Sequence, residues 1–221
     1  AHRQLVGETV EVDTIFIGGG TPTHLSPATL QILFSLILQH FRPTQNAEIS
    51  VEANPDGLDD ERLDVLRSNG VNRLSLGVQS FDNAVLKTLE RTHTGDQAMQ
   101  TVERCGNWFP NVSLDLIFGV PGQSSASWQQ TLKTATALPV KHISTYGLTF
   151  EKDTPFFRRE QHGQLKRAPD ELERTMYLDA IAQLGGLSQL SSSRIFIARP
   201  APNGVCGEQI LPVNWDEISR G

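Results

Sequence analysis

Five short runs of apolar and β-branched residues recur along the chain, separated by longer segments whose apolar residues repeat at helical spacing. The runs are Val12–Ile17, Glu48–Glu52, Arg73–Val78, Val112–Phe118 and His142–Leu148. Parallel strands that lie side by side must be joined by crossover connections, which are usually helices. The alternation therefore predicts an α/β fold built on a parallel sheet.

The segments between these runs carry residues that usually begin helices. Ser26 and Pro27 supply an N-cap and a proline at the first helical position, and the helix is expected to run to about His40. Further helices are expected at Asp59–Ser68, Asn83–Glu90, Asp96–Asn107, Ser125–Leu138 and Asp170–Leu184. A complete eight-unit barrel takes about 250 residues, so this chain is expected to hold a partial barrel. An open doubly wound sheet gives the same alternation, and periodicity does not separate the two.

The last part of the chain has a different pattern. Residues 188–221 combine serines, prolines and scattered apolar residues without a clean period. We expect a loop or a poorly packed tail there, and we divide the chain into a barrel region, residues 1–187, and a divergent or disordered tail, residues 188–221.

Composition excludes several classes of partner. The formal net charge of −6 argues against a nucleic-acid surface, because phosphate binding needs clustered lysine and arginine. No apolar run is long enough to be a transmembrane segment, and no secretory leader is present, so a cytoplasmic protein is expected. Cys105 and Cys206 lie far apart in no metal-binding spacing, which favours two free thiols.

Polar residues stand where the expected strands end, which is where parallel α/β folds bind ligands. They are the run Gly18–Thr23, Glu52 with Asn54, Gln79 with Ser80, Asp115, and the run Tyr146–Thr149. Three glycines let the backbone come close to a ligand, although a tight turn with nothing bound fits equally well. The two carboxylates could bind a ribose hydroxyl or an amino group, or could be paired with Arg73 or Arg91. His24, His93 and His142 show no mutual ligand spacing.

Taken in order, several segments resemble one family. They are DTIFIGGGTPTHLS, EISVEANPDGL, GVNRLSLGVQSFD, LERTHT, NVSLDLIFGVPGQS and LTFEKDTPF. Together they are similar to the radical S-adenosylmethionine (radical SAM) proteins related to oxygen-independent coproporphyrinogen III oxidase. The segments VEANP, GVQSF, DLIFGVPGQ and LTFEKDTPF favour the HemW branch, the heme chaperones. The resemblance covers about Val12 to Leu187.

The resemblance implies a partial (β/α)6 TIM-like barrel that lacks its first β/α unit. It also implies a 4Fe-4S cluster on a CxxxCxxC loop, with S-adenosylmethionine on the fourth iron. Gly19, Gly20 and Thr21 would line the methionine end of that ligand, and Glu52, Gln79, Arg91 and Asp115 match its other contacts. In the oxidase, a radical formed from the ligand acts on propionate side chains. In the HemW branch the implied role is to bind heme and pass it to an acceptor protein.

Two departures from the family pattern limit what this chain is expected to do. CxxxCxxC does not occur in the sequence and is expected upstream of Ala1, so the chain alone is expected to be inactive as an enzyme. The family segment like GYxQYEVSNFARPGxxCRHNxxYW is replaced by GLSQLSSSRIFIARPAPNGVCGEQILPVNW. We hypothesise a change of reading frame near Gln189; an intact single frame supported by RNA or peptide data would contradict it.

The sequence alone is compatible with three functional interpretations. The first is a HemW-like protein that binds heme, the second an anaerobic coproporphyrinogen III oxidase of porphyrin biosynthesis, and the third a cofactor-free barrel remnant that acts only as a binding module. In each, the edge position of Val12–Ile17 predicts poor solubility for the isolated chain, because its backbone groups lack a second partner strand.

Overall fold

The computed structural model describes residues 9–184, 194–200 and 208–214. The chain divides into two units, Ala1–Gln183 and Leu184–Gly221. In the first unit the strands are β1 (Val10–Ile17), β2 (Phe41–Ala53), β3 (Arg73–Gln79), β4 (Asn111–Phe118) and β5 (His142–Gly147). The α-helices are α1 (Pro27–His40), α2 (Asp60–Ser68), α3 (Asn83–Thr88), α4 (Gly95–Trp108), α5 (Ser125–Ala137), α6 (Pro155–Gln161) and α7 (Asp170–Gln183). Two short 3-10 helices, η1 (Pro22–His24) and η2 (Pro55–Gly57), follow β1 and β2.

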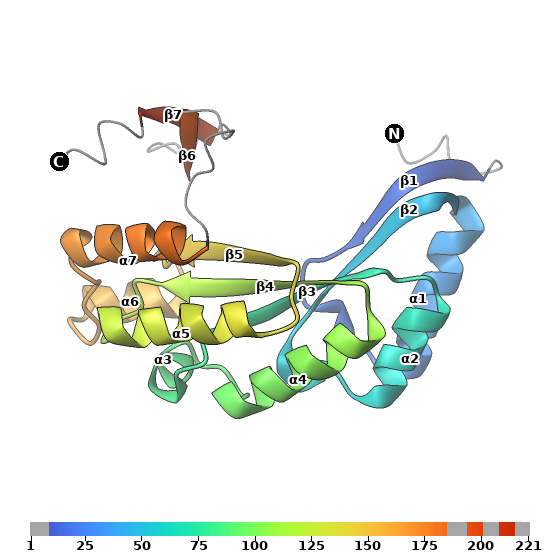
Figure 1. Cartoon of the computed structure of the whole chain (residues 1–221), viewed down its shortest axis with the longest axis horizontal. Helices are drawn as coiled ribbons and strands as arrows, with labels where there is room; N and C mark the ends of the chain where they lie inside the picture. The colour runs from blue at the N-terminus through green and yellow to red at the C-terminus, as the bar shows by residue number, and fades with distance from the viewer. Residues whose placement is uncertain (1–8, 185–193, 201–207, 215–221) are drawn as a thin grey trace. The chain divides into compact units, whose positions relative to one another are not determined.

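The five strands of the first unit form one parallel sheet in the order β1-β2-β3-β4-β5. A doubly wound sheet reverses its strand order at a switch point, whereas a barrel adds each strand beside the previous one. The order observed here follows the chain without a reversal, and the sheet curls, as Figure 1 shows. This settles the alternative left open by the sequence: the first unit is a partial TIM-like barrel.

One face of the sheet packs against helices and forms the core. Alternate strand residues such as Val51, Leu74, Leu76 and Leu114 are fully buried there. Figure 1 shows α1, α2, α4 and α5 along this side of the sheet, and α7 contacts α5, β4 and β5. The apolar residues of the strands therefore point toward the helices, and the other residue of each alternating pair points to the opposite face.

Local sequence signals explain where the helices begin. Ser26, Asp59, Ser124 and Thr154 each accept a hydrogen bond from a backbone N–H of the first turn that follows. Thr94 forms a complete capping box with Gln97 at the start of α4. The predicted helices are confirmed with small shifts at their ends, while α6 and the two 3-10 helices were not predicted.

The second unit contains two described strands, β6 (Arg194–Pro200) and β7 (Glu208–Asn214), paired antiparallel. The expectation of a loop is therefore wrong for these fourteen residues. Antiparallel pairing needs no helical crossover, so two short strands can form where the sequence shows no clean period. Cys206 and the point of the hypothesised frame change, Gln189, lie outside the described residues, and the divergence of the tail stays a prediction. No helix within the described ranges is long and apolar enough to cross a membrane.

Candidate functional site

The face of the sheet turned away from the helices is mainly polar from β2 to β5, whereas Phe16 of β1 and Ile117 of β4 are apolar. We call this surface the inner face. Its residues are Ser50, Glu52 and Asn54 from the second strand and its end, Arg73, Ser75, Gly77 and Gln79 from β3, Asn111, Ser113, Asp115 and Ile117 from β4, and His142, Ser144 and Tyr146 from β5. The strand register places Glu52 opposite Ser75, Ser75 opposite Ser113, and Asp115 opposite Ser144. Residues in register on parallel strands point the same way, so these side chains share one surface.

The glycine loop after β1 is anchored to the inner face through Glu52. The backbone N–H of Gly19 donates to Oε2 of Glu52 at 2.9 Å. Gly18 makes room for this carboxylate, because a Cβ at that position would lie 2.8 Å from the carboxyl carbon of Glu52. Gly19 has a φ of 106°, a conformation that favours glycine. Gly18 and Gly19 are therefore needed for a close approach between the loop and the end of β2.

A second set of contacts joins the loops after β1, β2 and β3. The side-chain amide of Asn54 donates to Oγ1 of Thr21 at 3.2 Å. A Cβ at Gly77 would lie 2.7 Å from Oδ1 of Asn54 and 2.9 Å from Nε2 of Gln79, so both amides pack over this glycine. Thr21 itself has a φ of 56°. The carboxyl ends of three successive strands thus converge on one small area.

Gln79 is held in a tight, strained turn. Its φ is 67°, and the N–H of Ser80 donates back to the carbonyl of Val78 at 2.8 Å. Nε2 of the buried His93 lies 3.1 Å from the same carbonyl, and burial lowers the pKa of this imidazole while the bond to Val78 opposes the shift. Non-glycine residues with positive φ are uncommon and concentrate at functional sites. This backbone conformation directs the side-chain amide of Gln79 toward the site, where it can both donate and accept hydrogen bonds.

Asp115 is the second carboxylate of the inner face. It lies within β4 and not at its carboxyl end, so the expectation of a strand-end position is wrong for this residue. Oγ of Ser75 donates to its Oδ2 at 3.0 Å. Burial raises the pKa of Asp115, hydrogen bonds from Ser75 and Ser144 act against the rise, Glu52 adds to it and His142 opposes it. Two carboxylates and an amide, with a backbone loop beside them, can accept hydrogen bonds from hydroxyl and amino groups of a polar ligand.

Arg91 takes part in none of these hydrogen bonds. It is half-buried, and burial lowers the pKa of its guanidinium while the charge of Asp56, in η2, acts against that shift. The alternative in which Arg73 pairs with Glu52 is wrong, because Nη1 of Arg73 lies 3.3 Å from Oε1 of Glu48. Glu52 is therefore free of that ion pair and holds the glycine loop.

Among the described residues, no group of three or more His, Cys, Asp or Glu side chains could hold a metal ion. Cys105 is buried in α4, and burial raises the pKa of its thiol to about 12. A thiol of that kind stays protonated at neutral pH and is unreactive. Cys105 is thus a core residue.

The serines of the inner face are site residues that the strand-end argument missed. Ser75, Ser113 and Ser144 lie within the strands and not at their ends. The signal was a period of two: polar or small residues alternate with apolar ones in RLSLGVQ and NVSLDLIF. A parallel sheet buried on both faces would instead read as continuous apolar runs.

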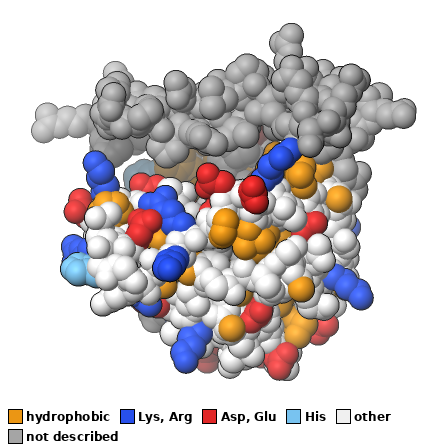
Figure 2. Space-filling model, turned by 90° about the vertical axis from the view of Figure 1, so that its left-hand side faces the viewer, with side chains coloured by type: hydrophobic (Ala, Val, Ile, Leu, Met, Phe, Trp, Pro, Cys, Tyr) orange, Lys and Arg blue, Asp and Glu red, His pale blue; other side chains and the backbone are white. Residues whose placement is uncertain are grey.

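Charges of both signs are mixed on the face shown in Figure 2, which looks at the molecule from the left-hand side of Figure 1. Acidic and basic side chains are interspersed with small hydrophobic areas, and no charge of one sign dominates the visible described surface. This face therefore has no broad field that would steer a polyanion.

Known proteins share this sequence and fold. A family model described as the radical SAM superfamily matches residues 3–135, more than half of the chain. The Bacillus subtilis (strain 168) protein named heme chaperone HemW is 42% identical over 169 residues, which cover 76% of this chain and 45% of that protein. The Bos taurus protein named radical S-adenosyl methionine domain-containing protein 1, mitochondrial, is 36% identical over 174 residues, covering 78% of this chain and 39% of that protein.

A solved structure gives the same result for the fold. Coproporphyrinogen III oxidase (HemN) from Escherichia coli, described as a radical SAM enzyme, superposes with a TM-score of 0.70 at 29% identity, covering 79% of this chain and 40% of that one. The chain spans less than half the length of these three proteins. The matched region runs from before β1 into α5 and so contains the glycine loop, Glu52, Gln79 and Asp115. The chain belongs to the radical SAM superfamily.

Proposed function

We propose that this chain is the S-adenosylmethionine-binding section of a HemW-like protein, whose intact form binds heme, a 4Fe-4S cluster and S-adenosylmethionine. One observation carries the proposal. The glycine loop after β1 is tied to the end of β2 by the Gly19–Glu52 and Thr21–Asn54 hydrogen bonds, on the same face as Gln79 and Asp115. This arrangement supports one ligand site, with backbone groups and Glu52 near the carboxyl ends of β1 and β2 and with Asp115 farther back within β4.

Each residue has a proposed task in binding S-adenosylmethionine. Gly19, Gly20 and Thr21 approach the methionine end of the ligand with their backbone groups. Glu52 and Asp115 accept hydrogen bonds from its amino or hydroxyl groups, and Gln79 both donates and accepts. Arg91 supplies a positive charge for a carboxylate, from its position beside Asp56.

The described residues do not fit the iron–sulfur cluster. Such a cluster needs several cysteine thiolates, and Cys105 is a single buried thiol. We therefore assign the cluster ligands to sequence outside this chain and derive no reaction step here. The chain by itself is proposed to bind ligand and not to turn over substrate.

The heme role rests on the relatives named heme chaperone HemW. We propose heme or a porphyrin as the cargo of the intact protein, an unidentified protein as the acceptor, and the cytoplasm as the location. A second candidate is oxygen-independent coproporphyrinogen III oxidase, which the similarity to HemN favours. The third, a cofactor-free binding module, is favoured for this polypeptide by the lack of a cluster-binding set in its described part.

The first prediction is direct binding of S-adenosylmethionine by the chain. Isothermal titration calorimetry is expected to give saturable binding to one site, with S-adenosylhomocysteine competing for it. Adenosine alone is expected to bind more weakly, because it lacks the amino and carboxylate groups that the loop and Arg91 would meet. A folded sample that shows no saturation with either ligand would overturn the proposal.

The chaperone and the oxidase are then separated with the full-length protein. After anaerobic reconstitution of the cluster, heme is added and its absorption spectrum is followed. A chaperone is expected to bind heme and to leave coproporphyrinogen III unchanged, whereas conversion of coproporphyrinogen III would favour the oxidase. Sequencing the gene upstream of Ala1 tests for the missing CxxxCxxC motif.

A further inference from the structure

Serine hydroxyls surround Asp115 from the strands on both sides of β4. Ser75 lies on β3 and Ser144 on β5, and Ser144 is in register with Asp115. Ser75 is in register with Ser113, two residues before Asp115, so its hydroxyl reaches Asp115 diagonally. Asp115 thus accepts a hydrogen bond from Ser75 on one side, and the side chain of Ser144 lies in register beside it on the other.

The contacts form a short directed chain. Oγ of Ser113 donates to Oγ of Ser75 at 3.1 Å, or alternatively to the carbonyl of Leu74 at 3.2 Å. Oγ of Ser75 in turn donates to Oδ2 of Asp115 at 3.0 Å. A hydroxyl that accepts one hydrogen bond while donating another is a better donor, because neighbouring bonds polarise each other. Ser113 therefore supports Ser75 without touching Asp115.

The charge on Asp115 is set by opposing influences. Burial and the carboxylate of Glu52, on β2, disfavour ionisation, whereas the hydroxyls of Ser75 and Ser144 and the imidazole of His142, on β5, favour it. Hydrogen bonds donated to a carboxylate stabilise its ionised form. If both serines were removed, only His142 would oppose the rise in the pKa of Asp115 that burial and Glu52 cause.

We propose that Ser75 and Ser144 are positioning residues that keep Asp115 ionised and fix its orientation for the adenosyl ligand. This inference rests on the proposed function, since Asp115 acts there as an acceptor. The residues that orient Asp115 are then serines within the strands. Their hydroxyls donate hydrogen bonds to the carboxylate and leave its negative charge unpaired. A lysine or arginine at position 75 would pair with Asp115 and remove it as an acceptor for the ligand.

The first test needs no ligand. The ionisation of Asp115 is followed by carbon-detected NMR against pH in the wild-type chain and in the Ser75→Ala, Ser144→Ala, Ser75→Thr and Ser113→Ala variants. Ser75→Ala and Ser144→Ala are expected to raise the pKa of Asp115, because each removes a donor to the carboxylate. Ser75→Thr keeps the hydroxyl and is expected to stay near wild type. Ser113→Ala removes a more deeply buried hydroxyl that makes no hydrogen bond to Asp115, and it is expected to have the smaller effect.

The second test separates positioning from a general loss of structure. Affinity for S-adenosylmethionine is measured at several pH values and expressed relative to wild type at the same pH, which cancels titration of the ligand. Ser75→Ala is expected to lose about tenfold in affinity at the acidic end of the range, where its raised pKa protonates Asp115 before that of wild type, and less than about twofold near about pH 8. A structural defect would lower affinity equally at every pH.

The outcomes distinguish the inference from the function beneath it. An unchanged pKa of Asp115 in Ser75→Ala and Ser144→Ala, or an equal change in Ser113→Ala, would overturn the positioning role. If both variants raise the pKa of Asp115 but no form of the chain binds S-adenosylmethionine, the proposed function would be overturned. The effect of the two serines on the ionisation of Asp115 would still be supported.

Discussion

Replacing Glu52 by alanine is expected to reduce the affinity for S-adenosylmethionine by at least about tenfold, because hydrogen bonds to a charged group contribute about 1.5–3 kcal/mol. The Glu52→Ala substitution removes two roles of the carboxylate at once. Its carboxylate accepts the N–H of Gly19 at 2.9 Å, which holds the glycine loop, and it is a proposed acceptor for the ligand. Isothermal titration calorimetry at neutral pH measures the loss.

The same loss is expected from a substitution that keeps the carboxylate. In Gly18→Ala, the new Cβ would lie 2.6 Å from the ring of Phe16 and 2.8 Å from Oε2 of Glu52. Phe16 is 63% exposed, so its ring can move aside easily, whereas Glu52 must give up its bond to Gly19. Gly18→Ala is therefore expected to weaken binding about as much as Glu52→Ala, although the total charge is unchanged.

Two further variants complete this experiment. Glu52→Gln keeps an acceptor for Gly19 and loses the charge, so its affinity is expected to lie between those of wild type and Glu52→Ala. Glu61→Ala removes an exposed carboxylate on α2 and serves as the matched control for net charge. If Gly18→Ala and Glu52→Ala bound as tightly as Glu61→Ala, the glycine loop would not be part of the ligand site.

Most of the sheet could be predicted from the sequence because its strands obey local rules. Leu74 and Leu76 alternate with Ser75 and Gly77, and the alternation fixes both the strand and its two faces. Strand order was not predictable in this way. It depends on how each helix packs back onto the sheet, which periodicity does not describe.

The start of β2 shows where a local rule failed. The sequence pattern predicted a strand only from Glu48. Upstream of it, Pro43 has no N–H to donate, and such a residue usually argues against a strand. The structure begins β2 at Phe41 and pairs Pro43 with Val12 of β1. The described pairing of β2 with β3 begins only at Ser50, so at Pro43 no partner on that side needs a donor.

The turn at Gln79 also depends on contacts with residues that are distant in the sequence. Gln79 takes a φ of 67°, which glutamine seldom adopts, while His93 reaches the carbonyl of Val78 from a later segment. That segment is fixed by Gly95, where a Cβ would lie 2.1 Å from the carbonyl oxygen of Phe81. Such a close approach of two backbones cannot be read from either segment alone.

The position of β4, the strand that carries Asp115, depends on Trp128, a residue of α5 that also contacts α7. The side chain is fully buried, and its ring centroid lies 5.6 Å from that of Phe118, at the end of β4. Nε1 donates to the carbonyl of Met176 in α7 at 2.7 Å. One residue thus joins two helices and the strand that presents Asp115, with both packing and a hydrogen bond.

Trp128→Ala is expected to lower the free energy of unfolding by about 3–5 kcal/mol, because it removes a large buried side chain and leaves a cavity. Trp128→Phe keeps an aromatic ring and loses the hydrogen bond and part of the volume, so a smaller loss is expected, of which the bond accounts for about 1 kcal/mol. Urea unfolding followed by far-ultraviolet circular dichroism measures both without relying on tryptophan fluorescence.

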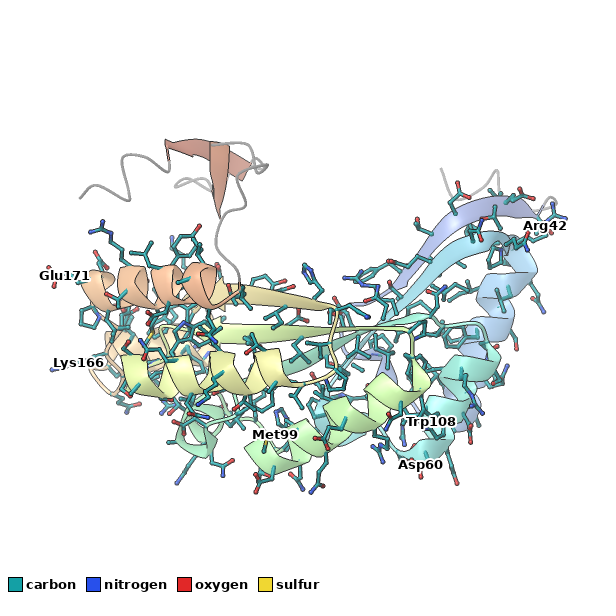
Figure 3. All side chains as sticks on the ribbon, in the orientation of Figure 1. Arg42, Asp60, Met99, Trp108, Lys166 and Glu171 are labelled. Atoms are coloured by element: carbon teal, nitrogen blue, oxygen red, sulfur yellow. The ribbon has the colours of Figure 1, made fainter. Side chains whose placement is uncertain are left out.

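Trp108 provides the matched control for this substitution. It lies on α4 (Figure 3), only partly buried, with the guanidinium carbon of Arg67 4.9 Å from its ring centroid. Trp108→Ala removes the same side chain without opening a sealed cavity, and a cation–π contact at such a site contributes only about 0.5–1 kcal/mol. Its loss of stability is therefore expected to be well below that of Trp128→Ala. Equal losses in the two variants would show that Trp128 has no special part in joining α5, α7 and β4.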